Sequence, residues 1–421
     1  MTTATETETE TRIRVAAVTY DYYPFDVRVR RLAEAAADAG CDMDVICLRD
    51  ESEAAREVYN GVGIYRLPMH RGFGESLPAR VVGWTWFMLR AGTLLTRLHR
   101  QQRYDVVHAH NMPDFLVFSG LIPRLGGARV ILDVQDTSPE LMAAKARGWK
   151  KRLLFRLAAI QEQVSARFAD HVVTVGWPFE QKLLARGVKP EKMTIVLNST
   201  DPKIFPPERQ GPSPNAANDP DKPFIVMYWG TVAERNGVDI ALRAVALARE
   251  AVPNLRLDVM GRGEQVPVLK QLAAELGIGD RVRFSDPVPA EEIVDFVVHG
   301  DMGIIPYRCD GFAELVLPTK AYELALMQRP IIATDMVGVR SMFRPESLAL
   351  CTPDDPRSFA DAIVTLARDP ERRARMVAAA AEDYAPYRWE VASARYVELL
   401  ARLSGRGTPA VSVRTATAAH S

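Results

Sequence analysis

The feature that most constrains this chain is a repeated alternation of short apolar, β-branched runs with amphipathic stretches. Apolar runs of this kind occur in the first half at 13–18, 43–48, 105–110, 129–134 and 171–175, and in the second half at 224–230, 255–261, 281–286, 302–307 and 330–335. Nearly continuous apolar strands are typical of sheets that helices cover on both faces. The alternation therefore predicts an α/β fold with doubly wound, Rossmann-like parallel sheets.

A proline-rich segment divides this pattern in two. Residues 201–223 hold seven prolines and almost no apolar period, which is typical of a linker between domains. Both chain ends are small and polar without helical period, which predicts disorder. The predicted order is a disordered N-terminus at 1–12, an N-terminal domain at 13–200, the linker at 201–223, a C-terminal domain at 224–386, a last helix at 387–403 and a disordered tail at 404–421.

Composition excludes several classes of function. Lys plus Arg and Asp plus Glu both total 53, so no global field draws the chain onto nucleic acid. The four cysteines form no zinc-binding spacing, which predicts no metal site and fits a reducing compartment. The first ten residues carry three glutamates and no apolar run, unlike a secretory signal. We therefore expect a cytoplasmic protein that contains no bound metal.

Ligands of such folds gather at the carboxyl ends of the strands, so the residues there are the candidates for function. The first such turn, 20–31, contains no glycine and therefore lacks the dinucleotide-binding fingerprint, which disfavours a hydride-transferring enzyme. Arg28 lies at the start of the following helix, where a cation suits a bound anion. A solvated basic helix face explains Arg28 equally well.

Histidines and acids follow in the next strands. Alternation places His108 and His110 on one face of a strand, with His110 at its tip. No third ligand lies at a useful spacing, so the pair is a poor zinc site, and His108 also fits a buried core histidine. We expect His110 to face the ligand. Asp136, after the next strand, could hold substrate hydroxyls or cap a helix.

The second half carries features suited to a phosphate. Gly230 and Gly237 bound a turn that leads into a helix, where backbone N–H groups approach an anion closely and Arg235 adds charge. Further on, Lys320 and Glu323 are three residues apart on one predicted helix face, and Glu314 precedes that helix. Lys320 can meet a diphosphate and Glu323 ribose hydroxyls. A surface Lys–Glu pair is the alternative, which the apolar character of the helix disfavours.

Four motifs in this order resemble a known family. They are YDYYPFDVRVRR at 20–31, VVHAHNMPDFLV at 106–117, GTVAERNGVDIALRA at 230–244 and LPTKAYELALMQRPIIAT at 317–334. They are similar to retaining glycosyltransferases of the GT-B fold, the group-one, family-four class, and the resemblance covers roughly residues 13–403. The chain departs from the family at Gln135, Thr231, Asn236 and Leu315, where relatives often carry His, Arg, Lys and an acid.

The resemblance implies two Rossmann-like domains that face each other across a cleft, with the last helix crossing back to the first domain. It implies retaining transfer of a hexose-type sugar from a nucleoside-diphosphate sugar to a hydroxyl, in polysaccharide, glycolipid or other glycoconjugate biosynthesis, without a cofactor or metal. The implied donor-binding residues are Gly230, Arg235, Gly237, Lys320 and Glu323. The implied catalytic residues are His110 and Glu314, and Arg28 and Asp136 are the implied acceptor or anion contacts.

Three questions stay open at this level. Residues 147–156 interleave basic and large apolar side chains, which suits either an anionic membrane surface or ordinary core packing. A membrane contact would favour a lipid-linked acceptor over a free saccharide or small molecule. Rival functions of the same fold are a nucleotide-sugar 2-epimerase and a catalytically silent binding module, and the departures at Thr231, Asn236 and Leu315 favour the silent module.

Overall fold

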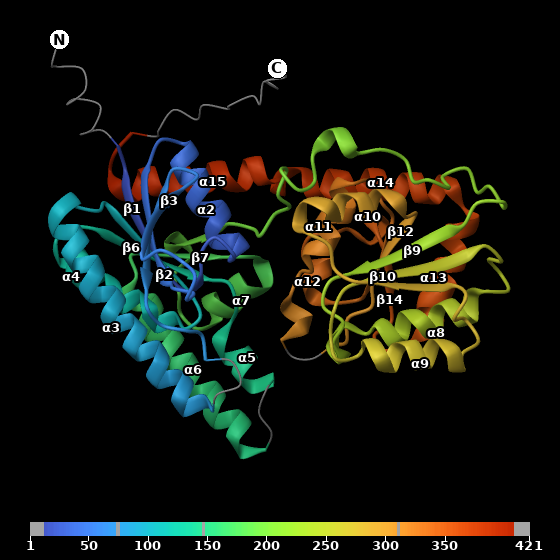
Figure 1. Ribbon diagram of the computed structural model, residues 1–421, viewed down its shortest axis with the longest axis horizontal. Helices are drawn as coiled ribbons and strands as arrows, with labels where there is room; N and C mark the ends of the chain where they lie inside the picture. The colour runs from blue at the N-terminus through green and yellow to red at the C-terminus, as the bar shows by residue number, and fades with distance from the viewer. Residues whose placement is uncertain (1–11, 73–75, 145–147, 310–311, 408–421) are drawn as a thin grey trace, which may run out of the picture. The chain divides into compact units, whose positions relative to one another are not determined.

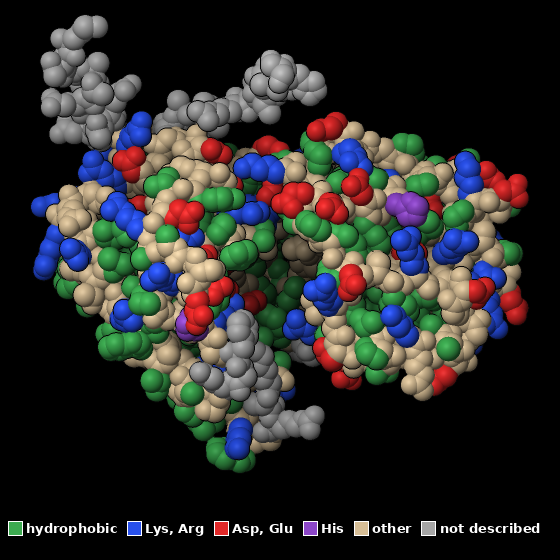
Figure 2. Space-filling view, in the orientation of Figure 1, with side chains coloured by type: hydrophobic (Ala, Val, Ile, Leu, Met, Phe, Trp, Pro, Cys, Tyr) green, Lys and Arg blue, Asp and Glu red, His purple; other side chains and the backbone are tan. Residues whose placement is uncertain are grey.

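The structure is a computed structural model that describes residues 12–72, 76–144, 148–309 and 312–407, folded as two compact units (Figure 1). The first unit comprises the described residues up to Asn198 together with those from Glu390 onwards, and the second runs from Ser199 to Trp389. Side chains of both charges are scattered over the surface of each unit (Figure 2), in keeping with the equal totals of 53 basic and 53 acidic residues.

The first unit is built on an eight-stranded sheet in the order β3-β4-β2-β1-β5-β6-β7-β8. Every neighbouring pair is parallel except β3 and β4, which are antiparallel. The strands are β1 (Arg14–Tyr22), β2 (Asp42–Leu48), β3 (Arg56–Tyr59), β4 (Val62–Leu67), β5 (Val106–His110), β6 (Arg129–Val134), β7 (His171–Thr174) and β8 (Met193–Ile195). The central strands are buried along nearly their whole length, as their apolar runs predicted.

Helices cover both faces of this sheet (Figure 1). The helices of the first unit are α2 (Val27–Asp38), α3 (Leu77–Gln102), the 3₁₀ helix η1 (Asp114–Gly120), α4 (Leu121–Leu125), α5 (Ser138–Ala144), α6 (Trp149–Phe168), α7 (Trp177–Ala185) and α15 (Trp389–Ser404). The core on one face joins side chains of α3, η1 and α6 to the strands. Asp26 caps α2 by accepting from the backbone of Val29, and Gly40 follows that helix at a φ of +88°.

The second unit repeats this plan with a six-stranded, wholly parallel sheet in the order β11-β10-β9-β12-β13-β14. Its strands are β9 (Phe224–Trp229), β10 (Leu255–Met260), β11 (Val282–Ser285), β12 (Met302–Ile305), β13 (Ile331–Thr334) and β14 (Ala349–Cys351). Its helices are α8 (Val238–Ala248), α9 (Val266–Glu275), α10 (Ile293–His299), α11 (Thr319–Leu326), α12 (Val337–Arg340), α13 (Pro356–Arg368) and α14 (Pro370–Tyr384). The core on one face joins α8, α9 and α13 to the strands, and α11 packs on β12 and β13.

The division of the chain differs from the expected one. It falls between Asn198 and Ser199, and residues 201–223 belong to the second unit rather than to a linker. Buried polar contacts fix this segment: the backbone N–H of Asn215 donates to Asp301 at 2.7 Å, and Arg373 donates to the carbonyl of Ala216 at 2.8 Å. Proline-rich composition therefore marks irregular backbone here, not an unattached connection.

The chain ends are described only in part. Residues 1–11 and 408–421 lie outside the described residues, as do residues 145–147 within the chain. The described start of the expected tail is held to the first unit, because Arg406 forms an ion pair with Asp105 at 2.9 Å. Among the helices of the described residues, none combines the length and apolar character that crossing a membrane requires.

Candidate active site

The candidate residues gather at the carboxyl ends of the strands in each unit. In an open parallel sheet, ligands bind where the strand order reverses. This point lies between β1 and β5 in the first unit and between β9 and β12 in the second. His110 ends β5, and the loop that begins at Gly230 follows β9.

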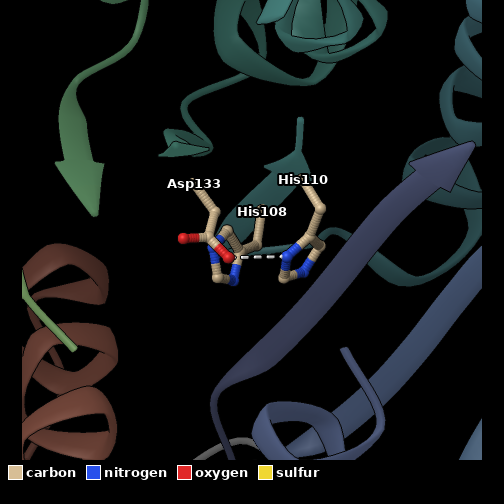
Figure 3. Close-up of side chains that lie close together, drawn as sticks. All are labelled: His108, His110 and Asp133. Atoms are coloured by element: carbon tan, nitrogen blue, oxygen red, sulfur yellow. Dashed lines mark hydrogen bonds and ion pairs between the residues drawn. The ribbon is translucent and has the colours of Figure 1, made fainter. Parts of the chain in front are cut away.

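In the first unit, His110 is fixed by a buried carboxylate. Asp133 is its register partner on β6, and the Nδ1 of His110 donates to Oδ2 of Asp133 at 2.9 Å (Figure 3). Both side chains are buried, and Asp133 is completely inaccessible to solvent. The bond at Nδ1 fixes the ring orientation and leaves Nε2 as the nitrogen that can meet a substrate.

The same carboxylate binds Arg28, which corrects the prediction that Arg28 contacts an anionic substrate. The guanidinium donates from Nε and Nη2 to the two oxygens of Asp133, at 2.9 and 2.8 Å, and from Nη1 to the carbonyl of Val196 at 3.0 Å. A bidentate pair of this kind uses the donors of Arg28 inside the protein. Burial alone would raise the pKa of Asp133, but the charge of Arg28 and the bonds from His110 and Arg28 hold it well below its usual value.

His108 lies beside this pair, with its ring centroid 4.1 Å from that of His110. Its Nδ1 is 2.9 Å from the hydroxyl of Tyr396 on α15, and its Nε2 is buried without a hydrogen-bond partner. Burial lowers the pKa of His108 well below its usual value, so the imidazole is neutral at physiological pH.

Asp133 also lies where it could act as a third metal ligand beside the two histidines, a ligand that the spacing in the sequence did not reveal. The ligand atoms of His108, His110 and Asp133 all lie within 4.8 Å of one another. However, both oxygens of Asp133 already accept bonds from Arg28, whose positive charge would oppose a bound cation. The carboxylate that would complete a metal site with the two histidines is therefore already engaged by a cation of the protein itself.

In the second unit, glycines let three loops meet backbone to backbone. Gly237 has a φ of +64°, and a Cβ there would lie 1.9 Å from the carbonyl oxygen of Pro306. A Cβ on Gly261 would lie 1.9 Å from the carbonyl oxygen of Gly230. Only glycine fits at these two positions. The loops after β9, β10 and β12 are thereby held together at the switch point.

Lys320 lies beside this junction as a buried cation that has no acidic partner among the described residues. It is on α11, only 8% exposed, and a Cβ on Gly230 would lie 3.1 Å from its Nζ. The ammonium donates to the hydroxyl of Tyr307 at 3.0 Å and lies 5.1 Å from the ring centroid of Tyr228. No carboxylate of the described residues lies within 4.0 Å of it. Burying a charge without a counter-charge is costly, so this arrangement suits a bound anion.

The other predicted residues differ in their surroundings. Glu323, half-buried and one turn after Lys320, accepts a bond from the indole of Trp229 at 2.8 Å. Arg235 is exposed, and its side chain forms no ion pair with any acid in the described ranges. Glu314 is exposed on the short 3₁₀ turn η6 (Ala313–Leu315). Asp136 is half-buried, and its carbonyl accepts from Asn111 at 2.7 Å.

Sequence reasoning did not assign the residues that hold these side chains in place. Asp133 orients His110, Tyr396 contacts His108 and Tyr307 contacts Lys320. Asp133 could have been found, because it is the last residue but one of the predicted strand at 129–134, which follows the strand of His110 in the sequence. Tyr396 could not, since it is 288 residues from its partner and lies in an otherwise ordinary amphipathic helix.

Two family models match the sequence, one in each unit. Residues 26–199 match the glycosyl transferase 4-like domain, and residues 223–369 match the glycosyl transferases group 1. Together these ranges contain His110, the loop after β9 and Lys320. The resemblance noted from the four motifs is thus confirmed.

Whole-length relatives and solved structures agree with these matches. The chain is 25% identical to a D-inositol 3-phosphate glycosyltransferase of Thermobispora bispora, over 89% of this chain and 88% of that protein. It is 26% identical to the enzyme of that name from Acidothermus cellulolyticus, over 87% and 82%. Sucrose-phosphate synthase of Thermosynechococcus elongatus superposes with a TM-score of 0.71 at 19% identity, over 94% and 100% of the two chains. Anabaena HepE in complex with UDP-glucose superposes with a TM-score of 0.67 at 16% identity, over 93% of this chain and 100% of that chain. The expected architecture of two Rossmann-like domains is confirmed.

Proposed function

This chain belongs to the glycosyltransferases of the GT-B fold, and we propose that it transfers a sugar from a nucleoside-diphosphate sugar to a hydroxyl acceptor with retention of the anomeric configuration. The product would be a polysaccharide, glycolipid or other glycoconjugate, made in the cytoplasm. A solved neighbour, Anabaena HepE, holds UDP-glucose, which supports a uridine nucleotide as the first donor to test.

The observation that carries the proposal is the buried ammonium of Lys320. It lies next to the backbone of Gly230 and has no carboxylate partner among the described residues, so a diphosphate would supply the missing negative charge. Departure of the nucleoside diphosphate develops negative charge on its oxygens, and a preorganised cation stabilises that charge. Arg235, exposed at the loop after β9, is the second cation we assign to this role. These two side chains would do the work without a metal ion.

The remaining donor contacts follow from the surroundings of each residue. We assign Glu323, which accepts a hydrogen bond from the indole of Trp229, to the ribose hydroxyls because it lies one turn after Lys320 on the same helix. Gly230 and Gly237 would let backbone N–H groups approach the phosphates closely. We assign Glu314 to the sugar hydroxyls because it precedes the helix that carries Lys320.

In the first unit we assign His110 as the catalytic side chain that contacts the sugar or the forming glycosidic oxygen. Its Nδ1 is held by Asp133, so its Nε2 would face the substrate in a fixed orientation. Asp136 is half-buried in the loop after β6, the strand that carries Asp133, and is the acceptor contact we propose. We assign Arg28 a positioning role, because it holds Asp133 in place. The acceptor is a saccharide, a lipid-linked molecule or a small hydroxyl compound, and a lipid-linked one would call for peripheral membrane contact near residues 147–156.

Thermal stabilisation by nucleotides tests the donor site. We expect one nucleoside diphosphate to raise the melting temperature of the wild type. At a nucleotide concentration of about a hundred times its Kd, binding adds about 2.7 kcal/mol to the free energy of unfolding. Lys320→Met should lose this response, because the variant keeps the apolar stem and removes the charge. Its ligand-free stability should stay within about 1.5 kcal/mol of the wild type. The variant loses a charged hydrogen bond worth about 1.5–3 kcal/mol, and removal of a buried charge that has no counter-charge among the described residues offsets this loss.

The matched control is Lys270→Met, which removes an exposed lysine from α9 in the same unit. This variant should respond to the nucleotide as the wild type does. A full response in Lys320→Met would refute the site. Stabilisation of the wild type by no nucleotide at all would refute the donor assignment.

Incubation with the stabilising nucleotide-sugar then separates the three functions that share this fold. Transfer to an added acceptor, slowed about 10²–10³-fold in Lys320→Met, is the expected result. Conversion of the donor to its 2-epimer without an acceptor would identify an epimerase. Binding with neither reaction would identify a silent module.

A further inference from the structure

Two helices of the first unit leave large apolar side chains in solvent. On α3 these are Val81, Val82, Trp86 and Leu89, and on α6 they are Trp149, Leu153, Leu157, Ile160 and Val164. We call these nine residues the α3–α6 surface. Both helices pack on η1, and their N-terminal ends project beyond the sheet in the same direction (Figure 1). Trp149 is 71% exposed and Val82 is 69% exposed, so these are not marginal cases.

The exposed residues of α6 follow a helical repeat. The spacings from Trp149 to Val164 are four, four, three and four residues, which places all five on one face over four turns, about 22 Å. A helix in a soluble protein normally turns such a face towards the core. Here the face points outward, and a contiguous exposed patch of this kind marks an interaction site. The sequence pattern at 147–156 alone suggested either outcome. Among the described residues of this segment none is buried, and only Leu154 and Phe155 are half-buried.

The charges beside this apolar face have one sign. Helix α3 has 26 residues with four arginines and no acid, although the chain as a whole has equal numbers of basic and acidic residues. The only acid of the 20-residue helix α6 is Glu162, which is buried and forms an ion pair with Arg186 at 2.6 Å. The basic residues of α6 are Lys150, Lys151, Arg152, Arg156 and Arg167. None of them, nor any arginine of α3, pairs with an acid in the described part of the chain.

Apolar side chains flanked by cations that form no ion pair with a described acid favour one kind of partner. A second copy of this chain would bring the same positive charge to a two-fold contact, and that repulsion opposes self-association. An anionic lipid bilayer complements both properties, because acyl chains accept the apolar side chains and headgroups neutralise the cations. Tryptophan is itself favoured at the boundary between headgroups and acyl chains. Hydrophobic and Lys/Arg side chains lie together at the lower end of the first unit in Figure 2.

We propose that the α3–α6 surface is a docking site for an anionic membrane, a peripheral contact in which both helices lie on the bilayer. This inference is independent of the donor site and holds for any of the three functions considered above. If the transferase function is correct, the contact explains how the enzyme would reach a lipid-linked acceptor.

Co-sedimentation of the full chain with vesicles tests the proposal. We expect binding to vesicles of phosphatidylcholine with 30% phosphatidylglycerol, and little binding to phosphatidylcholine alone. Leu157→Ser/Ile160→Ser should weaken the partition coefficient at least tenfold. Lys150→Gln/Lys151→Gln should weaken it roughly 25-fold, about fivefold per charge, because a basic residue near an anionic surface gains about 1 kcal/mol.

Each variant has a control matched in exposure or charge. Leu247→Ser/Val268→Ser removes two apolar residues of the second unit that are 53% and 56% exposed, close to the 54% and 58% of Leu157 and Ile160. Lys182→Gln/Lys189→Gln removes two exposed lysines of the first unit outside this surface. Both controls should bind as the wild type does.

Three results would overturn the proposal. They are a wild type that does not bind the anionic vesicles, binding that the α6 variants leave unchanged, and binding that the controls lose equally. A dimer in the wild type that Leu157→Ser/Ile160→Ser converts to a monomer would instead identify a protein interface. Unchanged circular dichroism and melting temperatures keep a folding defect from imitating a loss of binding.

Discussion

At the residue scale, Asp133 determines how the first unit's site is held together. Two residues that are far apart in sequence meet on its carboxylate: Arg28 donates from Nε and Nη2, and His110 donates from Nδ1. The strand pattern could predict that Asp133 and His110 lie side by side, because neighbouring parallel strands end at one edge of the sheet. It could not predict that Arg28 is already bound, since helix position alone suits an ion pair and an anion site equally.

Asp133→Asn should destabilise the protein by about 3–5 kcal/mol at pH 7, because it leaves the buried guanidinium of Arg28 without a counter-charge. Chemical denaturation measures this loss. Asp42→Asn is the matched control, since Asp42 is 41% exposed and its ion pairs with Arg12 and Arg14 are long, at 3.5 and 3.8 Å. That control should cost at most about 1 kcal/mol. An equal loss of stability in the two variants would contradict the conclusion that the buried Arg28–Asp133 pair stabilises the first unit more than an exposed ion pair does.

The Arg28–Asp133 pair also predicts how the stability of the protein depends on pH. The pKa of Asp133 is lower in the folded than in the unfolded state, so its stabilisation is fully present above the ordinary carboxyl pKa of about 3.9 and is lost as the pH falls towards the folded value. The difference in unfolding free energy between wild type and Asp133→Asn should therefore narrow below about pH 4. A difference that stays constant from pH 7 to pH 3 would show that the charge of Asp133 is not the cause.

At the scale of elements, the apolar pattern predicted the central strands and missed four peripheral ones. All the predicted strands form, but β3, β4, β8 and β14 carried no comparable signal. Strand β3 is largely exposed, β4 contains Gly63 and Arg66, and β8 and β14 have three residues each. Strands β3, β8 and β14 are edge strands, which bury only part of their side chains, so their sequences need not be continuously apolar. Strand β4 lies inside the sheet, and its apolar run is interrupted by Gly63 and Arg66.

The role of helix α15 depends on a contact with a residue far away in the sequence, the hydrogen bond between Tyr396 and His108. Tyr396→Phe should destabilise the first unit by about 1–3 kcal/mol, because the ring is kept while Nδ1 of His108 loses its buried partner, and Nε2 already has none. Urea denaturation measures this change. Tyr59→Phe on β3 is the control, since the hydroxyl of Tyr59 makes no hydrogen bond within the described ranges, and it should stay within about 0.5 kcal/mol. A similar loss of stability in both variants would show that the hydrogen bond to His108 is not the cause.

At the scale of the whole molecule, the two-unit organisation was visible in the sequence because the strand-helix alternation occurs twice. The position of the division was not, because composition cannot distinguish a linker from irregular backbone that is bonded to a unit, as Asn215 is to Asp301. The units also differ in continuity. The second is one uninterrupted stretch from Ser199 to Trp389, whereas the first needs residues from Glu390 onwards.

This difference predicts opposite results for two truncated chains. Residues 199–389 contain a complete sheet and core, so they should fold alone, melt cooperatively and keep the nucleotide-dependent stabilisation that Lys320→Met abolishes. A chain that ends at residue 389 lacks the buried side chains of Tyr396, Val397 and Leu400. At roughly 1.5–3 kcal/mol for each buried apolar side chain, their loss removes about 5–9 kcal/mol, comparable to the whole stability of a typical domain. Its first unit should therefore be unfolded at 25 °C, as limited proteolysis would detect. A protease-resistant first unit in that chain, or a 199–389 fragment that folds without responding to the nucleotide, would contradict this assignment of core and site to the two units.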